Sequence, residues 1–226
     1  MDISLYCEER GEGFPIVLLH GNGEDHTYFK NQLEFFSKKY RVIALDTRGH
    51  GKTPRGEGEF SIRRFASDLH EFLTEKGIKK CDLLGFSDGG NIVLLFALKY
   101  PHMLRKLVLN GANLFPKGVK TSVQLPIELG YRFAHFFSHF SMGAKKNAEI
   151  LSLMVNDPYI EPSELEYLRV PTLVIAGTND MIKEEHTRLI AEKLPCSKLV
   201  FVDGDHFIAA KKPKEFNKAV EEFLNE

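Results

Sequence analysis

Three side chains in this sequence have the types needed for nucleophilic catalysis, and each follows a short apolar run. Ser87 lies within Gly85-Phe86-Ser87-Asp88-Gly89, after an apolar run and before a helix-like segment. A G-x-S-x-G sequence between a strand and a helix predicts a sharp turn that exposes the serine hydroxyl. The flanking glycines leave room where side chains would collide with neighbouring elements. The pentapeptide alone also fits a structural glycine-rich turn. Its position between a strand-like run and a helix-like segment favours a nucleophile.

A nucleophilic serine needs a base to accept its proton and an acid to hold that base in one tautomer. His206 and Asp180 each come just past a strand-like run in the second half of the sequence. Loops that follow parallel strands meet at one edge of a sheet, so we expect Ser87, His206 and Asp180 to converge. Asp203 and Asp205 compete for the acid's role. Asp205 is adjacent to His206, and neighbours in sequence rarely orient a ring well, which favours Asp180.

A fourth element, His20-Gly21-Asn22-Gly23, follows the run Ile16–Leu19. Small residues here let the loop fold back and point a backbone N–H at a developing oxyanion. We assign that donor to Asn22, paired with the N–H of Asp88 directly after the nucleophile. One such donor is typically worth about 3 kcal/mol of transition-state stabilisation.

Other residues near these motifs have more than one interpretation. We expect Phe86 and Gly21 to contact the substrate, and His20 to hydrogen-bond the oxyanion loop rather than act as a base. The Asp88 side chain either caps the following helix or places a negative charge at the pocket floor that favours a cationic substrate group. His26 with Asp25 fits no regular metal-ligand spacing, and no metal site is predicted.

The chain resembles the α/β-hydrolase superfamily over nearly its whole length. The resemblance implies that fold, a Ser87-His206-Asp180 triad and a variable helical cap, and it carries little information on the substrate. The Phe-Ser-Asp-Gly-Gly form is similar to that of small esterases and amino-acid-ester hydrolases of the family. The matching segments contain His20-Gly-Asn-Gly, Asp46-Thr-Arg48-Gly-His50-Gly, Gly85-Phe-Ser87-Asp-Gly-Gly, Pro171-Thr-Leu-Val-Ile-Ala-Gly-Thr-Asn-Asp180 and Gly204-Asp-His206.

The elements that position these residues alternate between strands and helices, which predicts an α/β fold with a mostly parallel sheet. Gly11-Glu12-Gly13 reads as a hairpin-like turn, so we expect the first strand to be antiparallel to its neighbour. Continuous apolar runs indicate strands covered on both faces. The expected strands are Ile3–Cys7, Ile16–Leu19, Val42–Leu45, Cys81–Gly85, Lys106–Leu109, Thr172–Ala176 and Leu199–Val202.

Helical spacing fills the segments between the later strands. We expect helices at Phe60–Lys76, Asn91–Tyr100, His186–Leu194 and Pro213–Leu224. Residues 112–168 contain no strand-like run. We interpret them as a helical cap inserted into one domain of residues 1–226, whose core is 1–111 and 169–226. Within this block we expect helices at Pro126–Ser141, Ala144–Val155 and Pro162–Leu168, with a stripe of phenylalanines packed into the core.

Composition excludes several partner classes. The 226 residues have a formal net charge of −1, with scattered lysine pairs, so we expect neither nucleic-acid nor membrane binding. The 3 cysteines lack metal-ligand spacing, and Cys81 is expected in the core. No signal peptide is visible at the N-terminus, so a cytoplasmic location is expected. No cofactor is implied, and the sequence leaves the oligomeric state open.

These features favour a serine hydrolase that cleaves a small carboxylic ester, thioester or amide through an acyl-enzyme. A cofactor-free perhydrolase, a carbon–carbon bond hydrolase and an acyltransferase would use the same triad and stay open. Relatives with an aspartate nucleophile, such as dehalogenases and epoxide hydrolases, are disfavoured because residue 87 is serine. A small-molecule receptor built on the same fold is the alternative outside the enzymes.

Overall fold

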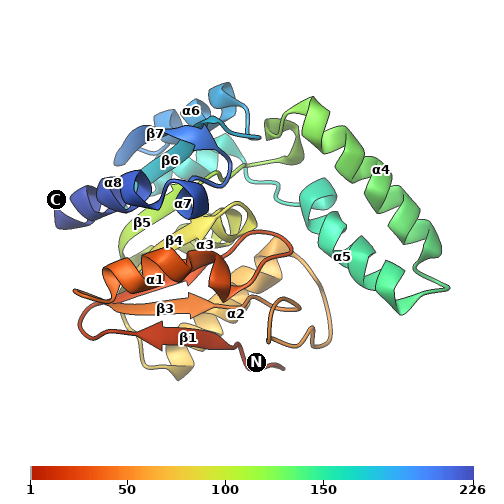
Figure 1. Cartoon of the computed structure of the whole chain (residues 1–226), viewed down its shortest axis with the longest axis horizontal. Coiled ribbons are helices and arrows are strands. Elements are labelled where there is room, and N and C mark those ends of the chain that lie inside the picture. Colours follow the sequence, from red (N-terminus) through yellow and green to blue (C-terminus); the bar gives the residue numbers. More distant parts are fainter. Residues whose placement is uncertain (1) are drawn as a thin grey trace.

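The computed structural model describes residues 2–226, which form a seven-stranded sheet with helices on both faces (Figure 1). The strand order is β1-β3-β2-β4-β5-β6-β7. Every neighbouring pair is parallel except β1 with β3. The strands are β1 (Cys7–Arg10), β2 (Pro15–Leu19), β3 (Arg41–Leu45), β4 (Cys81–Phe86), β5 (Leu104–Asn110), β6 (Thr172–Asn179) and β7 (Ser197–Asp205).

The sheet separates two hydrophobic cores because successive side chains of a strand point to opposite faces. In β4, Leu83 belongs to the core under α2, α3 and α6, and Leu84 to the core under α1, α7 and α8. The apolar runs of the central strands follow from this double burial. The helices are α1 (Lys30–Phe36), α2 (Ile62–Glu75), α3 (Asp88–Lys99), α6 (Glu184–Lys193), α7 (Ile208–Lys211) and α8 (Pro213–Asn225).

The first strand differs from its prediction. It begins at Cys7 rather than Ile3, and its antiparallel neighbour is β3, so the Gly11 turn is not a hairpin between sequential strands. A Cβ atom on Gly11 would lie 2.3 Å from the carbonyl oxygens of Ser37 and Tyr40. The turn therefore passes closely beneath the segment that leads into β3, and β3 lies between the first two strands of the chain.

Residues 112–168 add no strand to the sheet. Helices α4 (Thr121–Phe137) and α5 (Met142–Asn156) form a hairpin at one side of the molecule, followed by the 3-10 helix η4 (Pro162–Tyr167) (Figure 1). We call α4 and α5 together the α4–α5 hairpin. No helix within residues 2–226 is both long and apolar enough to cross a membrane.

The predicted core packing of the phenylalanine stripe is wrong. Phe133 is 69% exposed and Phe140 is 81% exposed, and Leu129, Phe136 and Phe137 are exposed as well. The buried residues of α4 are Gln124 and Ala134. At 100° per residue these lie on the side of α4 opposite the stripe, and the hydrophobic pattern alone did not show which side would be covered.

Candidate active site

Ser87 lies in the turn that joins β4 to α3, and its backbone is strained. Its φ is 52° and its ψ is −120°, and it is the only non-glycine residue with positive φ in residues 2–226. Its N–H donates to the Asn110 carbonyl oxygen at 2.8 Å. A Cβ atom on Gly85 would lie 2.2 Å from the Gly89 oxygen, and one on Gly89 would lie 2.1 Å from the Leu19 oxygen. Both flanking positions therefore require glycine, as the sequence predicted.

Asp180 and His206 are joined by a short hydrogen bond. The register pairs Asn179 of β6 with Asp205 of β7, so the two next residues leave the sheet side by side. The distance from Nδ1 of His206 to Oδ1 of Asp180 is 2.6 Å, and each residue is 4% exposed. The backbone N–H of Ile182 donates to the same Oδ1 at 2.8 Å. A carboxylate facing Nδ1 holds the ring hydrogen there and leaves the lone pair on Nε2.

The two competing aspartates have other partners. Asp203 Oδ1 accepts from the Thr178 hydroxyl at 3.3 Å. Asp205 accepts from the Phe207 N–H at 2.9 Å and pairs with Lys211. The structure therefore brings His206 together with Asp180 rather than with either neighbour in sequence.

The end of β5 links the serine to the histidine. Asn110 accepts the Ser87 N–H, and the next residue, Gly111, packs against the His206 ring with a φ of 62°. A Cβ atom on Gly111 would lie 2.7 Å from Cε1 of His206 and 3.4 Å from Oδ2 of Asp180. His206 Nε2 is buried and has no hydrogen-bond partner among the described residues, Ser87 included. The sequence analysis missed Gly111, although an Asn-Gly pair directly after a strand was a visible signal.

The two residues predicted as oxyanion donors are joined through their side chains. The Asn22 Nδ2 donates to Asp88 Oδ2 at 2.8 Å. Asp88 is in the first turn of α3, where a backbone N–H has no acceptor within the helix. Its carboxylate accepts from side-chain amides, with Asn91 the second donor at 3.4 Å, so of the two interpretations of Asp88 the helix cap is replaced by these hydrogen bonds. Burial raises the pKa of Asp88 to about 6.

His20 holds the loop that follows β2 and is in no position to act as a base. Its Nε2 accepts the Thr47 N–H at 3.1 Å, so its hydrogen is on Nδ1, which donates to the Gly21 carbonyl oxygen at 2.7 Å. Burial lowers the pKa of His20 to about 4, which keeps it neutral. Both ring nitrogens are therefore used to hold the loop.

Phe86, one of two stacked aromatic rings, lies against the His206 ring. The Phe86 ring lies 4.7 Å from the His206 ring and is stacked on Tyr28, with centroids 4.3 Å apart and planes 6° apart. Phe86 is only 1% exposed. Gly21, the other residue predicted to contact the substrate, is also buried, and a Cβ atom there would lie 3.0 Å from the Phe86 ring.

Glu24 is a further titratable group at this edge that the sequence analysis missed. Its Oε2 accepts the Gly21 N–H at 3.1 Å. Burial raises the pKa of Glu24 to about 7, and the nearby His206 opposes that rise. The neighbouring Tyr28 hydroxyl is buried without a hydrogen-bond partner in residues 2–226, and burial raises its pKa. No motif in the sequence indicates that this glutamate is half-buried.

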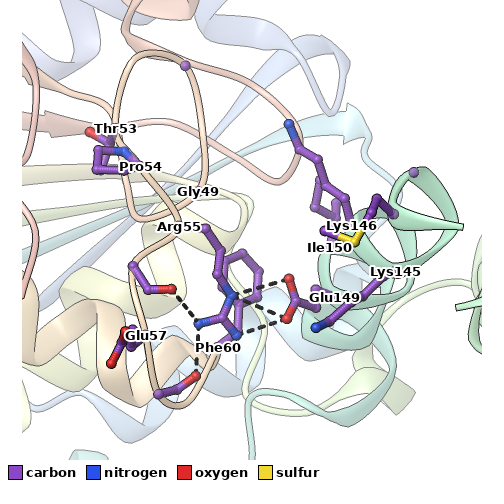
Figure 2. A pocket seen from close by; sticks show the side chains of 15 residues that line it. Gly49, Thr53, Pro54, Arg55, Glu57, Phe60, Lys145, Lys146, Glu149 and Ile150 are labelled. Atoms are coloured by element: carbon purple, nitrogen blue, oxygen red, sulfur yellow. Dashed lines mark hydrogen bonds and ion pairs between the residues drawn. The ribbon is translucent and has the colours of Figure 1, made fainter. Parts of the chain in front are cut away.

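A cavity of about 930 Å³ lies between the loop of residues 49–60 and α5 (Figure 2). Arg55 and Glu149 face each other at its wall, with Nη2 and Oε1 2.8 Å apart. None of Ser87, Asp180 and His206 lines this cavity. Ile150 lines the cavity, and its carbonyl oxygen accepts from the Asn22 side chain at 2.9 Å.

The acidic and histidine side chains around β3 make hydrogen bonds and ion pairs that hold the neighbouring loops in place. One oxygen of Asp46 accepts from both the N–H and Nδ1 of His26 at 2.7 Å, and the other accepts the Lys52 N–H at 2.8 Å. Asp25 brings a third candidate ligand atom within 4.8 Å of these groups. Arg48 is fully buried and pairs with Asp68 at 2.7 Å. These bonds hold the segment that follows β3 in place.

Comparisons with known proteins identify the family. Human serine hydrolase BPHL is 29% identical, and the alignment covers 98% of this chain and 83% of the human protein. A thermophilic esterase from Thermogutta terrifontis is 25% identical with a TM-score of 0.82, covering 99% of this chain and 93% of the esterase. An enol-lactonase from Burkholderia xenovorans LB400 shares the fold, with a TM-score of 0.84 at 21% identity, 99% coverage of this chain and 97% of the lactonase. The family model for the alpha/beta hydrolase fold matches residues 15–146, more than half of the chain, so this protein belongs to the α/β hydrolase family.

Proposed function

We propose that this protein is a serine hydrolase that cleaves a small carboxylic ester, thioester or amide. The observation that carries the proposal is the state of His206. Its Nδ1 is held by Asp180 at 2.6 Å, and its buried Nε2 is left without a partner. An imidazole oriented in this way has the properties of a general base, and we assign it to Ser87 in the strained turn.

In the first half-reaction, Ser87 attacks the carbonyl carbon of the substrate. His206 Nε2 accepts the hydroxyl proton and then donates it to the leaving group, and Asp180 stabilises the imidazolium that forms. The link through Asn110 and Gly111 supports this assignment, since it ties both residues to the end of β5. Hydrogen bonds of this kind are often long or absent in free enzymes and tighten when substrate binds.

The backbone N–H groups of Asn22 and Asp88 are our candidates for stabilising the negative charge on the tetrahedral intermediate. Asp88 follows the nucleophile at the start of α3, where the helix dipole also favours an anion. In the second half-reaction, water activated by His206 hydrolyses the acyl-enzyme. No step in this sequence requires a metal or an organic cofactor.

The activities of two relatives agree with the proposed reaction class. A serine hydrolase and an esterase are among the similar proteins. We assign residues 112–168 as the cap over the site, because their hairpin contacts the oxyanion loop through Ile150. We leave acyl-chain length and leaving group unassigned.

The test is labelling of the purified protein with a fluorophosphonate, followed by hydrolysis of chromogenic short-chain esters. Wild type should be labelled at Ser87, and Ser87→Ala should lose labelling and at least 1000-fold in kcat, since removal of a triad serine can cost on the order of 10⁶-fold. Ser67→Ala, which changes a serine on α2, is the matched control and should behave as wild type. Full esterase activity in Ser87→Ala would overturn the proposal. Product analysis with added alcohol, amine or peroxide separates hydrolysis from acyl transfer and perhydrolysis.

A further inference from the structure

The Asn22 side chain lies between the residue after the nucleophile and the α4–α5 hairpin. Its amide group donates one hydrogen bond to Asp88 Oδ2 at 2.8 Å and one to the Ile150 carbonyl oxygen at 2.9 Å. A primary amide has two N–H donors, so both are used. The residue assigned as an oxyanion donor is therefore held from two sides through its own side chain.

The Asp88 side of this bridge is rigid. Asp88 Oδ1 faces Asn91 Nδ2 at 3.4 Å, and the same Nδ2 donates to Asn113 Oδ1 at 3.1 Å. The Asn113 N–H donates back to Asn91 Oδ1 at 2.9 Å. All three of these residues are buried, so a network of amides and one carboxylate fixes this end against α3.

The Ile150 side of the bridge is not packed in the same way. Ile150 lines the cavity of about 930 Å³, so this part of α5 faces open space rather than a core (Figure 2). Beside it, Glu149 reaches Arg55 across the cavity wall at 2.8 Å, with side chains 25% and 34% exposed. A helix that adjoins a cavity can shift at less cost than one packed against a core on that face.

From this contrast we propose that Asn22 is a positioning residue that couples the position of the α4–α5 hairpin to the geometry of the oxyanion site. We call α5 seated when its Ile150 carbonyl oxygen accepts from the Asn22 side chain. When α5 is seated, Ile150 and Asp88 together fix the Asn22 amide, and through it the direction of the Asn22 backbone N–H. When α5 moves away, one of the two ties is lost and the donor is less well oriented. This inference rests on the proposed function and adds to it a dependence of turnover on the hairpin.

The first test removes both hydrogen bonds of the Asn22 amide in one variant and only the one to Ile150 in another. Asn22→Ala loses both, and kcat should fall on the order of 10–100-fold while KM changes by less than about threefold, since a donor that acts mainly in the transition state is affected. The double variant N22D/D88N swaps the two side chains. It keeps a hydrogen bond between positions 22 and 88 but leaves the Ile150 carbonyl oxygen without its donor. We expect kcat of N22D/D88N to stay low with a normal melting temperature. Recovery of wild-type kcat would show that the tie to the hairpin is irrelevant.

The second test loosens the hairpin at a distance from Asn22. Glu149→Ala removes the ion pair with Arg55. The matched control, Glu9→Ala, removes the ion pair between Glu9 of β1 and Arg41 of β3, in which the side chains of Arg41 and Glu9 are 32% and 34% exposed. Glu149→Ala should lower kcat about threefold to fivefold in the native background and leave kcat unchanged in Asn22→Ala, because the path is already broken. Glu9→Ala should have no effect in either background. Equal effects of Glu149→Ala in both backgrounds would overturn the coupling.

Hydrogen–deuterium exchange gives a readout that does not depend on activity. Glu149→Ala should speed exchange of the backbone amides of residues 20–24 severalfold in the native protein and add nothing in Asn22→Ala. Unchanged exchange in residues 20–24 would overturn the coupling even if the enzyme is active. Absence of fluorophosphonate labelling in wild type would instead remove the proposed function, and the exchange result would still decide whether the hairpin and the loop are linked.

Discussion

Gly111 lies in direct contact with the imidazole of His206, and its φ of 62° belongs to the left-handed region that favours glycine. The contact packs the end of β5 against the His206 ring, which Asp180 orients through a hydrogen bond. The position of the His206 ring is therefore fixed from the ends of two strands, β5 through packing and β6 through the hydrogen bond from Nδ1.

Gly111→Ala should reduce kcat on the order of 100-fold, because a methyl group 2.7 Å from Cε1 must displace the ring, and displacements of about 1 Å are costly in an active site. The control is Gly77→Ala. Gly77 has a similar φ of 67° but nothing within 4 Å of its Cβ position, so it should lose stability without losing kcat. Similar kcat values for the two variants would contradict the positional role of Gly111.

Asp180→Asn should lower kcat about 10⁴-fold near neutral pH, since an amide can present its N–H to Nδ1 and stabilise the wrong tautomer. Asp203→Asn and Asp205→Asn are the controls, because their oxygens contact Thr178, Phe207 and Lys211 instead of His206. Steady-state kinetics on one chromogenic ester decides among the three. A loss confined to Asp205→Asn would move the acid's role to that residue.

Much of the site was predictable because parallel strands buried on both faces read as continuous apolar runs. Once β4, β6 and β7 are recognised, the residues directly after them fall at one edge of the sheet. The same criterion failed at β1, whose residues Cys7–Arg10 are half-buried or exposed and include three charged side chains. An edge strand is paired on one side only and tolerates charge, so its sequence resembles a loop.

Other features could not be predicted from the sequence because they depend on contacts between segments that are far apart in the chain. The stripe of Phe133, Phe136 and Phe140 has helical spacing, but periodicity does not state which partner covers a face. Helix α1 was missed for lack of a clear start signal, since its N-cap residue Phe29 makes no side-chain cap hydrogen bond. The second hydrogen bond of Asn22, to Ile150 128 residues away, has no local signature at all.

The strain at Ser87 gives a stability prediction that is independent of the substrate. Ser87→Gly relieves a positive φ that Ser87→Ala retains, so it should be more stable than Ser87→Ala by about 1 kcal/mol, although both should be inactive. For a chain of this size, that corresponds to a melting temperature about 2–4 °C higher. The same pair of substitutions at Ser67 in α2 is the control, where glycine should be less stable than alanine. Equal melting temperatures for the two variants at position 87 would show that the turn is unstrained.

Glu24 provides a prediction about pH. Its ordinary pKa of 4.5 rises to about 7 on folding, so the folded protein binds this proton more tightly than the unfolded chain does. The free energy of unfolding therefore falls as pH rises from about 4.5 to about 7, and the cost is fully present above that range. Allowing for the partial exposure of this side chain, we expect a cost of about 1 kcal/mol at pH 8.

Glu24→Gln removes this titration while keeping an acceptor for the Gly21 N–H, which now lies 3.1 Å from Oε2. Its melting temperature should exceed that of wild type by about 2–4 °C at pH 8 and match it near pH 4.5. Glu12→Gln, in the exposed turn before β2, is the control and should show no pH-dependent difference from wild type. A constant difference between Glu24→Gln and wild type at both pH values would mean that packing, and not the charge of this buried carboxylate, sets its effect on stability.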